Sequence, residues 1–248
     1  MRRIGIDVGG TNTDGALLDG VEVVETIKTP TTDDVLSGIQ KVLEGLSHHD
    51  IGAVVIGTTQ FTNAVVQRSH LNQVGFLRIG LPAGRSLPPL VGWPPDLAEV
   101  VRGETLMVRG GIEYDGRPFE ELDEPAVIEA AHQFADLGNN AIVIAGSFSP
   151  IDTRQEDRAA EIIAEYHPKA QITVSHRLGQ LGLLERENAA GLNACLLELA
   201  GSVISAFASA IDQIGFGSGT RLFLTQNNGT LLQVEEAAKY PVLTFASG

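Results

Sequence analysis

The chain has 248 residues, of which 43% are hydrophobic, so it is long enough to bury a full core in one large domain or two small ones. Its formal net charge of -14 disfavours partners that present a phosphate backbone, so nucleic acid is not an expected ligand. A single cysteine, Cys195, excludes an internal disulfide and any multi-cysteine metal site. Asp7 interrupts the apolar stretch that a twin-arginine signal would need, and we expect a cytoplasmic protein.

The chain opens with a short strand that runs into a glycine turn. Apolar residues alternate with small or acidic ones over 4–8, which predicts a half-buried strand. The following Gly9-Gly10-Thr11 lets the backbone turn with its amide groups toward an anion, and Asp7 is a candidate metal ligand beside it. The alternative is a plain hairpin turn, because residues 16–18 and 21–24 continue as strands around a tight Asp-Gly turn.

The next segments alternate between helix and strand. Residues 31–34 are expected to cap an amphipathic helix that runs to Leu46. The apolar run 53–57 predicts a strand buried on both faces, followed by a polar turn and a helix that continues to about residue 66. A further strand is predicted at 73–79.

Residues 80–120 differ in composition from the rest of the chain. Prolines and glycines are crowded there, which indicates an insertion or a cap with short strands, of which 108–114 is the best candidate.

Beyond this segment the alternating pattern resumes. We predict a helix from Pro125 to Leu137, a strand at 141–145, a helix at 154–166 and a strand at 170–175. A long helical stretch from 183 to 214 follows, then a strand at 221–225, a short helix at 234–239 and a last strand at 242–245. Within the helical stretch, residues 192–211 are mostly apolar, but a serine-rich stripe on one side predicts a buried amphipathic helix and not a membrane span.

Strands that alternate with helices predict a mainly parallel sheet with helices on both faces, opened here by an antiparallel hairpin. The first strand leads into a hairpin and not into a helix through Gly-x-Gly-x-x-Gly, so a dinucleotide-binding Rossmann unit is not expected. The Walker pattern is also absent from the sequence.

Five motifs occur in the order and spacing of the hydantoinase A/5-oxoprolinase family, which the chain resembles over nearly its whole length. They are Gly5-Ile6-Asp7-Val8-Gly9-Gly10-Thr11-Asn12-Thr13-Asp14, Gly57-Thr58-Thr59 with Thr62-Asn63-Ala64, Phe148-Ser149-Pro150 followed by Glu156, Glu185-Arg186-Glu187-Asn188 with Leu192-Asn193-Ala194, and Gln226-Asn227-Asn228-Gly229-Thr230. The opening strand, turn and hairpin also resemble the first phosphate loop of the actin, Hsp70 and sugar kinase superfamily.

This resemblance implies a fold and a domain organisation. The fold is an α/β, ribonuclease H-like or actin-like ATPase lobe, whose mixed sheet opens with an antiparallel hairpin and carries helices on both faces. Residues 1–79 and 121–248 would form the lobe, with 80–120 as the insertion or cap. Family members continue into a second lobe with another phosphate loop, so the sequence corresponds to the N-terminal half, and the C-terminal lobe is absent from it.

The resemblance also implies an activity. Family members open a cyclic amide, of the hydantoin or 5-oxoproline type, at the expense of ATP and with Mg²⁺ or another divalent cation. The expected partners are a small cyclic amide and the missing lobe or a partner subunit, with no nucleic acid and no membrane. We also expect the protein to be an oligomer. Two alternatives stay open, namely a small-molecule kinase of the same superfamily and a non-catalytic lobe that docks with a partner subunit. With one phosphate loop, the chain alone is expected to bind ATP weakly.

The residues that match the family motifs receive roles in this scheme. Asp7 orients the metal ion and, with Asp14 as a candidate base or second metal contact, forms the catalytic pair. The residues expected to hold phosphate oxygens are Gly9, Gly10, Thr11 and Thr13. The residues expected to contact substrate are Thr58, Thr59 and Asn63. The alternative, that Thr58 or Thr59 caps the following helix, stays open.

Four further ionisable residues are weaker candidates. Glu156, Glu185 and Glu187 each carry a carboxylate, but their helical patterns favour a solvated surface. His176 follows a strand without a second histidine at a ligand-like spacing, which favours a hydrogen-bonded structural role.

Overall fold

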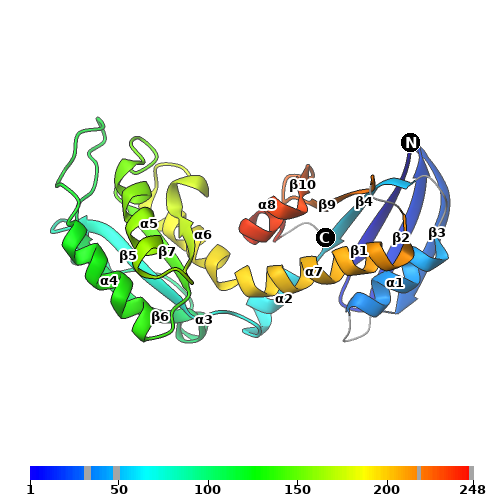
Figure 1. Ribbon diagram of the computed structural model, residues 1–248, viewed down its shortest axis with the longest axis horizontal. Helices are drawn as coiled ribbons and strands as arrows, with labels where there is room; N and C mark the ends of the chain where they lie inside the picture. Colours follow the sequence, from blue (N-terminus) through cyan, green and yellow to red (C-terminus); the bar gives the residue numbers. More distant parts are fainter. Residues whose placement is uncertain (31–34, 47–50, 217–218, 246–248) are drawn as a thin grey trace. The chain divides into compact units, whose positions relative to one another are not determined.

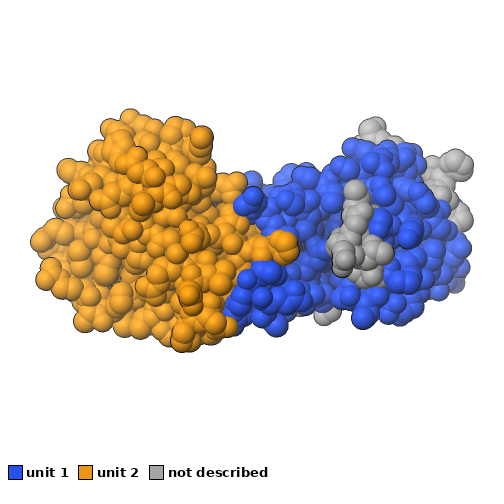
Figure 2. Space-filling view, turned by 90° about the horizontal axis from the view of Figure 1, so that it is seen from below, with its two compact units in different colours: residues 1–69, 198–248 blue, residues 70–197 orange. Residues whose placement is uncertain are grey.

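The computed structural model describes residues 1–30, 35–46, 51–216 and 219–245. The expected helix cap at 31–34 lies outside these residues. The chain forms two compact units, coloured blue and orange in Figure 2. Unit 1 comprises Met1–Ser69 and Glu198–Gly248, and unit 2 comprises His70–Leu197. Unit 1 is therefore built from two pieces of chain that are separated in the sequence by the whole of unit 2.

Unit 1 contains a six-stranded mixed sheet with the order β10-β9-β4-β1-β2-β3 (Figure 1). Its strands are β1 (Arg2–Val8), β2 (Asn12–Asp19), β3 (Glu22–Pro30), β4 (Ile51–Thr58), β9 (Arg221–Thr225) and β10 (Leu231–Gln233). The first three strands form an antiparallel meander, whereas β4 pairs in parallel with both β1 and β9. The predicted opening hairpin is confirmed, and the sheet becomes parallel immediately beside it.

Two helices cover one face of this sheet. The helices of unit 1 are α1 (Val35–Gly45), α2 (Gln60–Gln67), α7 (Leu197–Ile214) and α8 (Val234–Lys239), followed by the 3-10 helix η2 (Pro241–Thr244). Helix α1 packs so closely on β2 that a Cβ atom at Gly15 would overlap with Val42. Helix α7 lies beside α1, since Gln40 Nε2 donates a hydrogen bond to Gln213 Oε1 at 2.5 Å (Figure 1). The opposite face of β1 and β2 carries the candidate functional residues.

Helix α7 has the amphipathic pattern that the sequence predicts. Its buried face includes Val203, Phe207 and Ile211, and its serines at 202, 205 and 209 are exposed. By length and composition alone it is also the one helix, in the described part of the chain, that would suffice to cross a membrane. The polar stripe matches a helix that packs one face on a sheet.

Unit 2 contains a four-stranded parallel sheet with the order β6-β5-β7-β8. Its strands are β5 (Val74–Leu81), β6 (Arg102–Arg109), β7 (Ala141–Gly146) and β8 (Gln171–Val174). Its helices are α3 (Pro95–Val101), α4 (Glu124–Asp136), α5 (Arg154–Tyr166), the 3-10 helix η1 (Ser175–Arg177) and α6 (Leu183–Cys195).

Helices cover both faces of the unit 2 sheet. A Cβ at Gly75 would meet the ring of Phe134 from α4, and a Cβ at Gly191 of α6 would meet the ring of Phe76. Gly75 and Phe76 are neighbours on β5 and therefore face opposite sides of the sheet. Helix α4 packs with α5 on one side, against a core that includes Leu77, Ile79 and Ile144. The predicted fold class, α/β with a hairpin-opened mixed sheet and helices on both faces, is confirmed.

Four expectations differ from the structure. The helical stretch predicted from 183 to 214 consists of two helices, α6 and α7, that are separated at Leu196. The strands form two sheets and not one. The segment 80–120 was expected as an insertion or cap, but its residues 102–109 form β6 of the unit 2 sheet. The strand predicted at 108–114 ends at Arg109, because Gly110 and Gly111 adopt positive φ values of 139° and 118°. The last predicted strand, 242–245, is instead the 3-10 turn η2, in which Thr244 Oγ1 donates to the carbonyl of Pro241 at 2.9 Å.

Candidate functional site

The turn between β1 and β2 is closed by its own backbone. The amide of Gly9 donates to the carbonyl of Asn12 at 3.0 Å, and a Cβ at Gly9 would lie 3.1 Å from that oxygen. The close approach favours glycine, because a Cβ would require the carbonyl of Asn12 to move by a few tenths of an ångström. The Gly9 amide therefore holds the hairpin together and is not directed at a ligand, in contrast to the expected phosphate contact.

The two residues after Gly9 offer donors to solvent. Gly10 and Thr11 are exposed, and their amides donate to no residue in the described part of the chain. Consecutive unpaired backbone N–H groups in a turn form a concave donor site for an anion. Of the predicted phosphate contacts, the Gly10 and Thr11 amides and the Thr11 hydroxyl remain accessible.

Thr13 lies on the other face of the sheet. It is 1% exposed, and its Oγ1 would be only 3.2 Å from a Cβ placed at Gly38 of α1. Side chains alternate along β2, so Thr13 faces α1 whereas Asp14 faces away from it. The structure thus separates Thr13 from the residues that it was expected to join at a phosphate.

Asp7, Asp14 and Lys28 form a row across three strands. Asp7 pairs with Asp14 in the antiparallel register of β1 and β2, and Asp14 pairs with Lys28 in the register of β2 and β3. Residues directly opposite each other share a face of the sheet. Lys28 Nζ lies 3.1 Å from Asp14 Oδ1, and both side chains are about half exposed or more. Asp7 is exposed and makes no ion pair within the described part of the chain.

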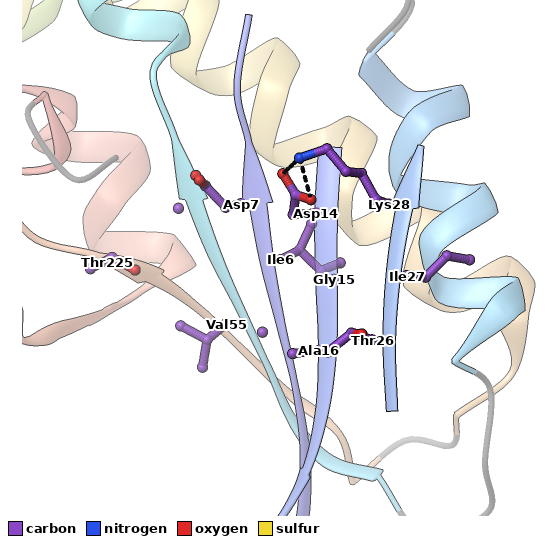
Figure 3. A pocket seen from close by; sticks show the side chains of 12 residues that line it. Ile6, Asp7, Asp14, Gly15, Ala16, Thr26, Ile27, Lys28, Val55 and Thr225 are labelled. Carbon is purple, nitrogen blue, oxygen red and sulfur yellow. Dashed lines mark hydrogen bonds and ion pairs between the residues drawn. The ribbon is translucent and has the colours of Figure 1, made fainter. Parts of the chain in front are cut away.

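This row lines a cavity of about 830 Å³ on the open face of the unit 1 sheet (Figure 3). The lining residues are Gly5, Ile6, Asp7, Asp14, Gly15, Ala16, Thr26, Ile27, Lys28, Val55, Gly57 and Thr225. Gly5, Ala16 and Gly57 have small side chains or none, which leaves space above the sheet in the cavity. Asp7, Asp14 and Lys28 gather at one end of the cavity (Figure 3). Lys28 and Thr225 were not found from the sequence. Lys28 had a weak signal, because a lysine in a strand beside the predicted hairpin shares a face with its carboxylates in one of the two possible registers.

The turn between β4 and α2 lies beside the glycine turn. The Thr59 amide donates to the carbonyl of Val8 at 3.4 Å, and Asn63 Nδ2 donates to Thr59 Oγ1 at 3.4 Å. Asn63 Nδ2 is also 4.0 Å from the position of a Cβ at Gly10. Two of the three predicted substrate contacts, Thr59 and Asn63, are thus brought to the end of β1.

Thr58 has a structural role at the start of α2. Its side chain is fully buried, and its Oγ1 accepts a hydrogen bond from the amide of Gln60 at 3.2 Å. This satisfies one of the amides that a helix N-terminus leaves unpaired. Of the two threonines considered as helix caps, Thr58 makes the capping hydrogen bond with its side chain. Thr59 is the N-cap residue, but its side chain makes no cap hydrogen bond.

Unit 2 contains a buried polar network that the sequence did not indicate. Glu156 is fully buried, and its Oε1 accepts from the Gly146 amide at 2.7 Å and from Ser149 and Ser175 at 2.6 Å each. Burial alone would raise the pKa of Glu156, but hydrogen bonds from His176, Ser149 and Ser175 outweigh it and hold the pKa below its usual 4.5.

Arg186 is the cation of this network. It is 1% exposed, its Nε donates to Ser175 Oγ at 2.9 Å, and its Nη2 donates to Ser149 Oγ at 3.0 Å and to the Gly146 carbonyl. Burial lowers the pKa of Arg186. The expectation of solvated carboxylates was wrong for Glu156 and for Glu187, which is 1% exposed, whereas Glu185 is exposed. His176 has the structural role that was expected, since its Nδ1 lies 2.7 Å from Glu156 Oε2.

Comparison with known proteins gives the family. The family model of the hydantoinase/oxoprolinase N-terminal region matches residues 3–167, which include the glycine turn and most of unit 2. The chain belongs to this family. Its resemblance to the family, first read from the five motifs, is confirmed.

Three relatives show how far the similarity extends. Caprolactamase subunit alpha of Pseudomonas jessenii is 26% identical over 92% of this chain, and an uncharacterized protein of Methanocaldococcus jannaschii is 24% identical over 99%. The crystal structure of the ATP-dependent caprolactamase from Pseudomonas jessenii covers 92% of this chain with a TM-score of 0.73 and 25% identity. A nucleotide-free acetone carboxylase structure covers 100% with a TM-score of 0.73 and 21% identity, and it shows the shared actin-like fold. The chain spans only 36–39% of the length of these relatives.

Proposed function

We propose that this chain supplies a phosphate-binding part of an ATP-dependent enzyme that opens a cyclic amide. The observation that carries the proposal is the turn at Gly10 and Thr11, whose amides donate to no described residue and lie at the end of β1 beside the exposed carboxylate of Asp7. Such a turn suits a phosphate, because backbone N–H groups bind anions without requiring basic side chains. This resolves the difficulty that an acidic chain poses for nucleotide binding.

The relatives support the choice of reaction. A caprolactamase acts on a lactam, which is a cyclic amide, and the similar structure is described as ATP-dependent. Cyclic amides are poor electrophiles, so their hydrolysis gains from activation. Transfer of the γ-phosphoryl group to the amide oxygen forms an O–P bond, breaks the bond to ADP and makes the carbon more electrophilic. Water then attacks this carbon and the C–N bond breaks, which opens the ring and leaves an acyl phosphate. A second water cleaves the acyl phosphate into the carboxylate and phosphate, so that the whole reaction consumes one ATP and two water molecules.

The residues of the open sheet face fit a magnesium ion as well as phosphate. Mg²⁺ is usually held by one or two carboxylates together with water and substrate phosphates. Asp7 can supply the carboxylate, and no cluster of three or more His, Cys, Asp or Glu side chains exists among the described residues to bind a metal without substrate. When bound, the ion would neutralise charge on the phosphates. Asp7 would hold it, and the Gly10 and Thr11 amides would orient the phosphate oxygens.

Substrate specificity would arise next to this turn. Thr59 and Asn63 lie within reach of Gly10 and present a hydroxyl and an amide, groups that can pair with a ring amide of the hydantoin, 5-oxoproline or lactam type. We assign Thr58 to the helix cap and not to the substrate.

A partner is part of the proposal. The Pseudomonas relative is named as a subunit, and this chain covers 36% of it, so a further lobe or subunit would complete the site. The reaction itself is therefore assigned to the whole protein.

Two measurements test this function. In a ¹H–¹⁵N titration with MgATP, we expect the Gly10 and Thr11 amide signals to shift, and Asp7→Asn to weaken the Mg²⁺-dependent part of the binding. Asp19→Asn, at the far end of the hairpin, serves as the matched control. The whole protein, purified from cells, should then convert a lactam, hydantoin or 5-oxoproline with ATP into a ring-opened product, ADP and phosphate. A phosphorylated metabolite with an intact ring would instead support a kinase, and MgATP without effect on the turn would contradict the proposal.

A further inference from the structure

Lys28 has a position that the proposed function does not yet use. It is the only lysine or arginine among the described residues that line the cavity, and it lies at the same end as Asp7 and Asp14 (Figure 3). Two carboxylates and one ammonium give this end a formal charge of about -1. A polyphosphate placed there would be repelled by the carboxylates unless cations offset them, and Lys28 is the cation that the chain itself provides.

The partner of Lys28 is held weakly. Lys28 Nζ contacts Asp14 at 3.1 and 3.3 Å, but the two side chains are 63% and 48% exposed. Exposed ion pairs contribute little to stability, because water screens them and side-chain entropy opposes them. A lysine on a flexible four-carbon stem can therefore leave Asp14 for a stronger anion at low cost.

The floor of the cavity leaves space for such an exchange. A Cβ at Gly5 would meet nothing within 4 Å, and Gly57 and Ala16 are the neighbouring small residues on β4 and β2. The row next to the charged one on this face is Val55, Gly5, Ala16 and Thr26, so its two middle positions carry no side chain or only a methyl group (Figure 3).

We infer that Lys28 exchanges its ion pair with Asp14 for a contact with the phosphate groups of the bound nucleotide, and that Asp14 holds the lysine in place while the site is empty. The inference rests on the proposed function, since it names a further residue of the same site. It assigns Asp14 a positioning role and not that of a general base.

The test compares four proteins in ¹H–¹⁵N titrations with MgATP and, separately, with adenosine. They are the wild type, Lys28→Gln, Asp14→Asn and the control Lys41→Gln, which removes an exposed lysine from α1 outside the cavity. We expect Lys28→Gln to weaken MgATP binding about tenfold or more, as loss of a charge-assisted contact does, and Lys41→Gln to leave it unchanged. Asp14→Asn should bind MgATP at least as tightly as the wild type, because it releases Lys28. Adenosine should bind all four proteins equally.

The outcomes separate the two proposals. If the Gly10 and Thr11 signals shift with MgATP but Lys28→Gln binds like Lys41→Gln, the role of Lys28 is overturned and the proposed function stands. Weaker MgATP binding by Asp14→Asn overturns the positioning role of Asp14 and points to a metal contact. If MgATP shifts no signal of the turn in the wild type, both proposals fail. Thermal unfolding of each variant verifies that the comparison is made on folded protein.

Discussion

Arg78, in the middle of strand β5, forms an ion pair with Glu187 of helix α6, and both side chains are buried, with exposures of 0% and 1%. Arg78 Nε donates to Glu187 Oε1 at 2.6 Å, Nη2 donates to Oε2, and Nη1 donates to the carbonyl of Leu87 at 2.8 Å. The pair is therefore bidentate, which is the strongest arrangement for these groups. The buried guanidinium of Arg78 thus connects strand β5 with helix α6 and with the loop that follows β5.

Removal of one partner of this pair should destabilise unit 2 strongly. Glu187→Gln preserves the size of the side chain but leaves the Arg78 guanidinium buried without a counter-charge, a change that typically costs ~3–5 kcal/mol. Urea denaturation followed by Trp93 fluorescence measures this loss. Glu185→Gln, two residues earlier on α6 and exposed, is the matched control and should unfold like the wild type. A double variant with Arg78→Met and Glu187→Leu should recover much of the loss, and failure to do so would contradict an electrostatic cause.

The pH dependence of stability should report Glu156. Its pKa is held below 4.5 in the folded protein, so the unfolded chain binds its proton more readily. The stabilisation is therefore complete above pH 4.5 and is lost as the pH falls through the lower folded pKa. We expect the unfolding free energy to decrease over this acidic range, and Glu156→Gln to remove that part of the decrease while it lowers stability at pH 7. Glu165→Gln, exposed on the same helix, should retain the wild-type slope.

Two glycines of the first hairpin should respond in opposite ways to alanine. Gly15→Ala would place a methyl group into Val42 and 3.0 Å from Leu46 Cδ1, and overpacking of this kind costs ~1–3 kcal/mol. Gly5→Ala faces open space on the other side of the sheet and should leave stability unchanged or raise it by up to ~1 kcal/mol, because alanine loses less backbone entropy than glycine. Chemical denaturation followed by circular dichroism compares the two variants. Equal losses would mean that α1 does not pack on β2 as described.

Cys195 should be inert in the folded protein. It is fully buried on α6, and burial raises the pKa of its thiol to about 12, so the reactive thiolate is almost absent at neutral pH. We expect no reaction with an aromatic disulfide reagent under native conditions and one reactive thiol per chain in guanidinium. Rapid labelling of the native protein would show that unit 2 opens locally around α6.

The sequence predicted local elements well, because their signals are local. Helix α5, strand β9 and helix α8 begin and end where the apolar period and the turn residues indicate. The last segment was misassigned because its apolar residues resemble a strand, whereas the Asn227 amide and side chain bind the carbonyls of Leu243 and Val242 and hold a 3-10 turn. Those bonds join residues that are far apart in the sequence.

The site was predicted in part for the same reason. The acidic and glycine residues of the turn could be located from their spacing, but which donors are unpaired depends on the hydrogen bond between Gly9 and Asn12. The burial of Glu156 depends on Ser175 and Arg186, which come from other elements. A charged residue within the apolar strand 74–79, Arg78, was the one sequence signal that a buried ion pair existed, because such a residue needs a counter-charge.

The division of unit 1 into two pieces of chain has a consequence for biosynthesis. The ribosome completes all four strands of unit 2 before it makes β9, so unit 2 can fold first although unit 1 begins earlier. Until β9 emerges, nascent β4 presents an apolar edge of unpaired backbone groups, the kind of edge that invites pairing with other chains. The sheet that carries the glycine turn is therefore completed only after unit 2 has been synthesised. The rate of translation through residues 70–220 determines how long the edge of β4 remains unpaired.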